Sequence, residues 1–321
     1  MREYVEKEKQ KFQDLDLTDR TELKQKYENM LNPYLDSLNS YISANCNSFS
    51  YQIIWNDIDS NIQNRSDKVG EDKYVIELFL FVPYIFERYL KEQKNLSEKN
   101  TDTIITNILV NSLYHEFFHI AFGHCTIPED IKIPDKIRCM FEVMCDKSAL
   151  KLLTDNFDLF FAIEKKKNGF ESAFSNFVQT YATIISCMVI QYTCLEDLEL
   201  YKMEKNIEDD IINKRNKLPE KKKYLTYTSN DRNHPFVVFR FDYLLELIEN
   251  RLREHELNEE QLKFLFDKVD VFLIEFGFPK KFCINPYTRR NRKKIKEFYD
   301  VDFDTMFKYV KKCYIKNLVA G

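Results

Sequence analysis

The chain has 321 residues, of which 44% are hydrophobic, and this is enough for the core of one large domain or of two smaller ones. Its 48 basic and 52 acidic residues give a net charge of −4, a balance that argues against a protein designed to bind nucleic acid. Only 5 Gly and 8 Pro argue against a loop-rich β protein and against disorder. We expect a single domain over residues 1–321.

Eight cysteines without a CxxC pair are typical of free thiols in a reducing compartment rather than of a disulfide framework. The N-terminal stretch "MREYVEKEKQKFQDLDL" lacks the apolar segment of a secretory signal. The most apolar long stretch, 177–195, contains Gln, Tyr and Thr, which favours a buried core helix over a membrane span. We therefore expect a cytoplasmic protein without a membrane or nucleic-acid partner. The oligomeric state is left open.

The first predicted elements are charged helices over 2–45, with a break near 32–34. Residues 1–48 would thus form a helical N-terminal extension. The runs "SYQIIW" (50–55) and "KYVIELFLFV" (73–82) are rich in β-forming residues and are bounded by polar or Gly-containing segments. Both predict strands, although the second could instead start a helix that continues through "YIFERYLKEQ".

A strong helix is predicted over 101–123, with Thr101 or Thr103 as its N-cap and Gly123 at its end. A second helix is predicted over 135–154. Further helices are predicted at 157–166, 170–200, 235–252, 258–276 and 302–316.

The stretch 201–233 is charged and aperiodic, and this predicts a flexible loop or hairpin. Together these elements indicate a mainly α (α+β) fold with a small β-sheet beside the helix over 101–123.

That helix contains an H-E-x-x-H motif, formed by His115, Glu116 and His119. The two histidines lie one turn apart on an inward-facing stripe that starts at Ile105. Two buried imidazoles need two sets of partners in a dry place, and one divalent cation satisfies both. Glu116 lies about 100° around the helix, where a general base could take a proton from water. The alternative is a pair of core histidines satisfied by hydrogen bonds.

The next helix offers a third ligand. Glu142 and Asp146 are four residues apart and share one face, with Phe141 and Val143 beside the glutamate. A carboxylate in such surroundings needs a cation or several donors. Glu142 would supply an oxygen ligand, and Asp146 would accept the free N–H of a ligand imidazole. The alternative is that both are ordinary surface acids.

Weaker candidates surround these residues. His124 follows His119 by five positions, beyond the expected helix end, and is better explained as a neighbouring or surface residue than as a ligand. The three cysteines that flank the motifs also remain as weaker metal candidates: Cys125, Cys139 and Cys145.

A third motif lies downstream, where His234-Pro235 and Arg240 begin a predicted helix. His234 and Arg240 could donate hydrogen bonds or charge to an oxyanion. The alternative reading is a capping histidine and a surface arginine.

The order H-E-x-x-H, E-x-x-x-D and H-P-x-x-x-x-R resembles the gluzincin metallopeptidases. It is most similar to the HtpX and CAAX-prenyl-endopeptidase group and to the Lit-like phage-exclusion proteases. The resemblance covers motifs within 115–240, with the sequence between them unaligned. Cys145 stands where HtpX-type enzymes usually have Ala, and the chain lacks their membrane helices, so the Lit-like branch fits better.

The resemblance implies a zincin-like fold that holds Zn²⁺. It assigns the residues as follows: His115, His119 and Glu142 as zinc ligands, Glu116 as general base, Asp146 as the hydrogen-bond acceptor of a ligand imidazole, and His234 and Arg240 near the transition state. We therefore expect a zinc-dependent endopeptidase that acts on a protein or peptide substrate, with phage defence as the setting that the resemblance suggests. An extended substrate could pair with a strand such as 73–82. The alternatives are a catalytically inactive zincin-fold protein that binds metal or partners as a regulator, and a helical interaction protein.

Overall fold

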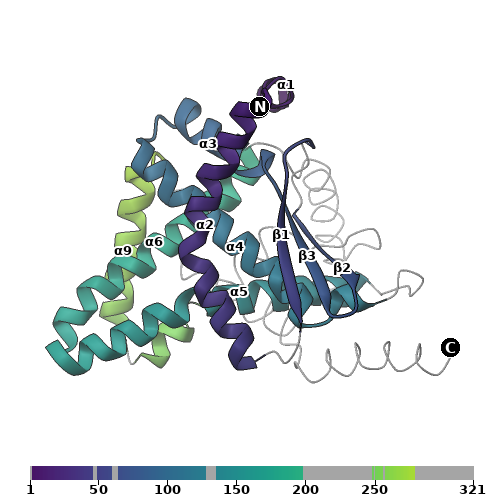
Figure 1. The fold of residues 1–321 in the computed structure, drawn as a ribbon. Helices are drawn as coiled ribbons and strands as arrows, with labels where there is room; N and C mark the ends of the chain where they lie inside the picture. Colours follow the sequence, from purple (N-terminus) through teal and green to yellow (C-terminus); the bar gives the residue numbers. More distant parts are fainter. Residues whose placement is uncertain are drawn as a thin grey trace, which may run out of the picture.

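A computed structural model describes the chain over 2–45, 49–59, 64–127, 135–197, 248, 250–255 and 257–278. The described part is mostly helical and contains one three-stranded sheet, as predicted (Figure 1). The predicted loop over 201–233, the helix over 302–316 and most of the helix over 235–252 lie outside the described residues.

Two helices begin the chain, α1 (Arg2–Gln13) and α2 (Leu17–Asn45). The predicted break near Pro33 is wrong, because α2 continues through this proline and the break lies before Leu17 instead. Proline removes one backbone hydrogen bond from a helix. Leu31 and Leu38, on either side of Pro33, are both buried in the core, and this packing offsets the loss.

The sheet consists of β1 (Ser50–Asn56), β2 (Arg65–Gly70) and β3 (Lys73–Phe79), in the order β1–β3–β2. β1 runs parallel to β3, and β2 runs antiparallel to it. Strand β2 was not predicted, because "RSDKVG" is mostly charged and small and has no alternating apolar residues.

Both alternatives for the run over 73–82 prove right in part. The strand β3 ends at Phe79, and the helix α3 (Phe81–Gln93) begins two residues later. Alternate residues of β3 face the core, where Tyr74, Ile76 and Leu78 are buried.

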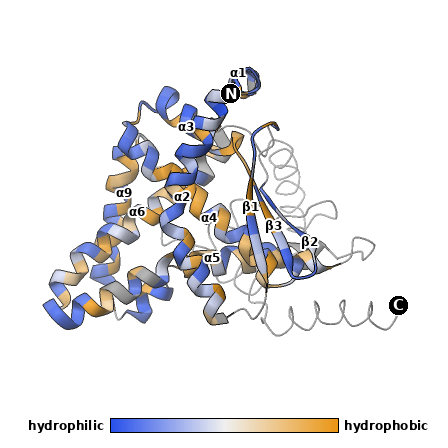
Figure 2. Cartoon of the chain, viewed as in Figure 1, coloured by the Kyte–Doolittle hydropathy of each residue, from blue (hydrophilic) through white to orange (hydrophobic). Residues whose placement is uncertain are grey.

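The helix α4 (Glu98–Ala121) is the centre of the described fold, because it packs against α2, α3, α5, α6, β2 and β3. Hydrophobic residues line it, whereas α1 is mostly hydrophilic (Figure 2). The predicted caps are wrong at its start, since Ser97 is the N-cap and its side chain accepts a hydrogen bond from the Asn100 backbone. Gly123 follows the helix with a φ of 74°, which turns the chain.

Of the remaining described helices, α5 and α6 pack on α4. The predicted pair over 135–154 and 157–166 is one continuous helix, α5 (Asp135–Asn168). After Gly169 the chain returns as α6 (Phe170–Asp197). The last described helix is α9 (Glu259–Glu275), which packs on α6.

Residues Phe170–Gln191 of α6 have the length and apolar composition of a membrane-spanning helix. This helix packs against α4, α5 and α9, and Tyr181, Ile185 and Ile190 are buried. This degree of burial is typical of a helix in the core of a protein.

Candidate metal centre

The packing of α4 against α5 brings the two sequence motifs together. His115 and Glu116 of α4 and Glu142 and Asp146 of α5 are all buried, at 9% relative exposure or less. Carboxylates and imidazoles seldom occupy such positions unless they are paired or bind a cation.

Donor atoms of three side chains, those of His115, His119 and Glu142, lie close together at this contact, and we call this group the triangle. The Nε2 atoms of His115 and His119 are 3.1 Å apart. A Glu142 carboxylate oxygen lies 3.2 Å from Nε2 of His115, and the other lies 3.5 Å from Nε2 of His119. Zinc–nitrogen bonds of about 2.1 Å in tetrahedral geometry place neighbouring ligand atoms about 3.4 Å apart. The observed distances are close to this spacing, with one oxygen of Glu142 facing each imidazole.

Asp146 determines which nitrogen of His115 can bind a cation. Its carboxylate lies 2.8 Å from Nδ1 of His115. Because a carboxylate only accepts hydrogen bonds, Nδ1 must carry the proton. In the neutral ring, Nε2 then presents its lone pair to the triangle.

The triangle is strongly attractive to positive charge. Burial by itself would lower the pKa of His115, but the carboxylates of Asp146 and Glu142 outweigh it and raise this pKa to about 10. Without a proton or a cation, the lone pairs of two imidazoles and a carboxylate would face one another in a buried place. A divalent cation neutralises the same field with more charge than a proton.

Glu116 follows His115 in α4, is buried, and does not belong to the triangle. Its negative charge contributes to the raised pKa of Cys125 and of Cys145, although burial is the largest cause for both thiols. A carboxylate in this position can exchange a proton with a water held at the triangle.

The structure also brings together residues that were weaker candidates in the sequence. Nδ1 of His124 is 3.0 Å from Nδ1 of His119 and 3.7 Å from Sγ of Cys145. Burial, followed by the neighbouring His119, lowers the pKa of His124 well below its usual value. The only sequence signal for this contact was the closeness of His124 to the motif. The Cys139 side chain lies outside the described part of the structure.

Strand β2 borders the centre. The Sγ atom of Cys125 is within hydrogen-bond distance of the Ser66 carbonyl, at 3.3 Å. The strand order places β2 at an edge of the described sheet and β3 in its middle. The expectation that the run over 73–82 pairs with a substrate is therefore wrong, because both sides of β3 are already bonded to strands.

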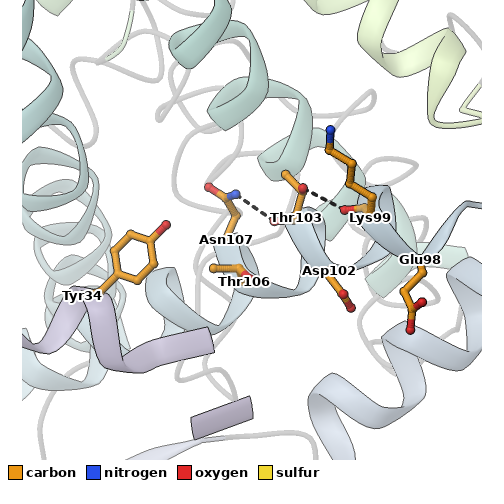
Figure 3. Close-up of a pocket in the computed structure, with 7 residues that line it drawn as sticks. All are labelled: Tyr34, Glu98, Lys99, Asp102, Thr103, Thr106 and Asn107. Atoms are coloured by element: carbon orange, nitrogen blue, oxygen red, sulfur yellow. Dashed lines mark hydrogen bonds between the residues drawn. The ribbon is translucent and has the colours of Figure 1, made fainter. Parts of the chain in front are cut away.

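A separate open pocket of about 610 Å³ lies along the first half of α4, and Tyr34 of α2 lines it on one side (Figure 3). Polar groups in its wall bond to the helix itself, since Thr103 donates to the Lys99 carbonyl and Asn107 to the Thr103 carbonyl. None of the metal-centre residues lines it.

His234 and Arg240 lie outside the described residues, so their relation to the triangle is not seen. No protein-family model, curated protein or solved structure matches the chain.

Proposed function

We propose that the protein is a zinc-dependent endopeptidase with a zincin-like fold, acting on a protein or peptide substrate in the cytoplasm. The observation that carries the proposal is the triangle formed by His115, His119 and Glu142, and a buried glutamate, Glu116, follows His115 in the chain. Two imidazoles and one carboxylate are the ligand set of several zinc hydrolases, in which a fourth position stays open for water or substrate. Phage defence as the biological setting is supported by the motif resemblance alone.

Bound zinc would supply a Lewis acid that lowers the pKa of water and polarises a carbonyl. The chain's residues perform the remaining tasks. Glu116 accepts the proton of the attacking water and passes it to the leaving amine. Asp146 holds the Nδ1 proton of His115 and so keeps the ring in its ligand orientation. His234 and Arg240 remain candidates for stabilising the oxyanion.

The test compares two variants of the full-length protein. We expect Glu116→Gln to retain near-stoichiometric zinc but to lose at least about 100-fold in peptide cleavage, the usual contribution of a general base. Glu142→Ala should lose zinc and cleavage together, because it removes a corner of the triangle. Zinc is measured by elemental analysis. Cleavage is measured by a search for new N-termini in a proteome exposed to each protein.

A matched control is Glu98→Gln, the same change at an exposed position of the same helix, which should behave as wild type. Retention of zinc by Glu142→Ala would remove the ligand assignment. Full activity of Glu116→Gln would remove Glu116 as base. Stoichiometric zinc in a wild-type protein that produces no new N-termini would favour the regulatory metal-binding alternative.

A further inference from the structure

A second group of donor atoms lies against the proposed zinc triangle. His119 of α4, His124 of the short 3-10 helix η1 (His124–Thr126) and Cys145 of α5 present ligand atoms that all lie within 4.8 Å of one another. His119 belongs to both groups but uses a different nitrogen in each. Its Nε2 faces His115 and Glu142, and its Nδ1 faces His124.

The distances in this second group also suit a metal ion. Nδ1 of His124 is 3.0 Å from Nδ1 of His119 and 3.7 Å from Sγ of Cys145. Zinc–nitrogen bonds of about 2.1 Å and zinc–sulfur bonds of about 2.3 Å give tetrahedral separations of about 3.4 Å between two nitrogens and about 3.6 Å between nitrogen and sulfur. Both observed values lie within about 0.4 Å of these.

Hydrogen bonding satisfies this arrangement poorly. In a neutral ring, Nδ1 of His124 offers either one proton or one lone pair, yet His119 and Cys145 both approach it. A single lone pair accepts one good hydrogen bond, so one of the two neighbours is left with a weak contact. One cation would bind the lone pairs of all three atoms.

The second group is also held in position before any ion binds. The His124 ring stacks on Phe141 with the ring centres 3.9 Å apart and an interplanar angle of 19°. Cys145 is fully buried on α5, and Gly123 with its positive φ directs η1 back toward α5. A rigid donor set loses little conformational entropy on binding.

We propose that His119, His124 and Cys145 form a second metal site, with a two-nitrogen, one-sulfur donor set that selects soft or borderline cations such as Zn²⁺ or Cd²⁺. A thiolate ligand favours these ions over Mg²⁺ and Ca²⁺. Binding displaces the thiol proton of Cys145 and the proton on Nδ1 of His119, and both are released to solvent.

Because the two sites share His119, their occupancies are coupled. When both are filled, the His119 ring bridges two cations, and its bond to the first ion changes. Excess soft metal therefore inhibits the enzyme. This consequence rests on the proposed endopeptidase function, whereas the binding itself does not.

The test is a Co²⁺ titration of the metal-free, full-length protein, because a thiolate–cobalt bond produces an intense near-ultraviolet charge-transfer band. We expect two equivalents of Co²⁺ to bind and the band to saturate with one of them. Cys145→Ser should abolish the band, and His124→Ala should weaken Co²⁺ binding at that site at least about 10-fold. Glu142→Ala, which removes the first site, should keep the band.

Cys187→Ser is the matched control, because Cys187 is an equally buried thiol on α6 and its removal should leave the band unchanged. Cys145→Ala serves as a second variant if Cys145→Ser does not fold, as judged by circular dichroism. The proposal is overturned if wild type shows no band, or if the band survives in the folded Cys145 variants. Loss of the band in Cys125→Ser but not in Cys145→Ser would likewise overturn it.

The inhibition is measured as the loss of peptide cleavage at excess Cd²⁺, relative to each variant's own activity without it. We expect inhibition in wild type and none in Cys145→Ser. A charge-transfer band in a protein without peptidase activity would leave the second site standing and reject the proposed function. Peptidase activity in a protein without the band would reject the second site and leave the proposed function standing.

Discussion

At the scale of single residues, Asp146 controls the chemistry of His115. Its carboxylate is almost fully buried and accepts the Nδ1 proton at 2.8 Å, so the lone pair of Nε2 faces His119 and Glu142. An imidazole held in this way is a better metal ligand, because the carboxylate fixes its tautomer and raises its basicity. In the proposed metal centre, Asp146 would therefore act on the metal through His115.

Asp146→Asn tests this role. An amide can donate its N–H to Nδ1 and so move the ring proton to Nε2, where it blocks the ligand position. We expect the zinc affinity to fall by about 10- to 100-fold while the helical content is retained. The measurement is competition with a chelator of known affinity. Asp267→Asn, the same change at an exposed position of α9, should leave the affinity unchanged. An unaltered affinity in Asp146→Asn would show that Asp146 does not position a ligand.

At the scale of elements, β2 is the edge strand of the described sheet that lies beside the proposed metal centre. It lies at an edge of the described sheet and packs against both α4 and η1. The Cys125 thiol, next to His124, contacts its Ser66 carbonyl. Edge strands can add a peptide through main-chain hydrogen bonds.

We expect a substrate peptide to pair with β2 in extended conformation. In that geometry alternate residues of the peptide direct their N–H groups toward the strand. Methylation of single backbone nitrogens in a cleaved peptide should therefore lower kcat/KM at every second position and have a small effect at the positions between. Steady-state kinetics on the methylated series measures this. A uniform effect along the peptide would contradict pairing with a strand.

At the scale of the whole molecule, a polar network ties three helical segments together. Asp158 of α5 accepts hydrogen bonds from Tyr181 of α6 and from Arg251, and its carboxylate lies 3.0 Å from Nε2 of His255. Burial alone would raise the pKa of Asp158, but its hydrogen bonds from His255 and Tyr181 and the charge of Arg251 outweigh it and lower the pKa below 3.8. The network thus stabilises the packing of the C-terminal described segment on α5 and α6.

Asp158→Asn should make the fold less stable and change how its stability depends on pH. A carboxyl whose folded pKa is lowered contributes its full stability above its unfolded value, here 3.8, and loses it as pH falls through the folded pKa. We expect the variant to lose about 2 kcal/mol of unfolding free energy at neutral pH, a typical contribution of hydrogen bonds to a charged group. Below neutral pH, the unfolding free energy of the variant should fall less steeply with decreasing pH than that of the wild type. Urea unfolding at a series of pH values checks both expectations, and parallel curves for the two proteins would contradict the assignment.

The sequence pattern predicts some elements correctly and fails for others. The residues of the stripe that includes His115 and His119 recur with the helical period of 3.6 residues, and this spacing predicted a buried helix with the two imidazoles one turn apart. The run over 73–82 was predicted as a strand, with the start of a helix as the alternative, and it contains both. By contrast, "RSDKVG" has no apolar alternation, and it forms β2 because it pairs with β3. The break expected at Pro33 failed for a related reason, since tertiary packing outweighed a local preference.

The sequence by itself determined a mainly helical fold and the side chains available for a metal, because helix periodicity and residue chemistry are local properties of the chain. The tertiary structure decided which of these side chains meet. The packing of α5 on α4 brings Glu142 and Asp146 to the histidines, and it also joins His124 to Cys145, a contact between residues 21 positions apart. That contact depends on the turn at Gly123 and on the rotation of α5 about its axis. Neither follows from local preferences, because both are set by how the core packs.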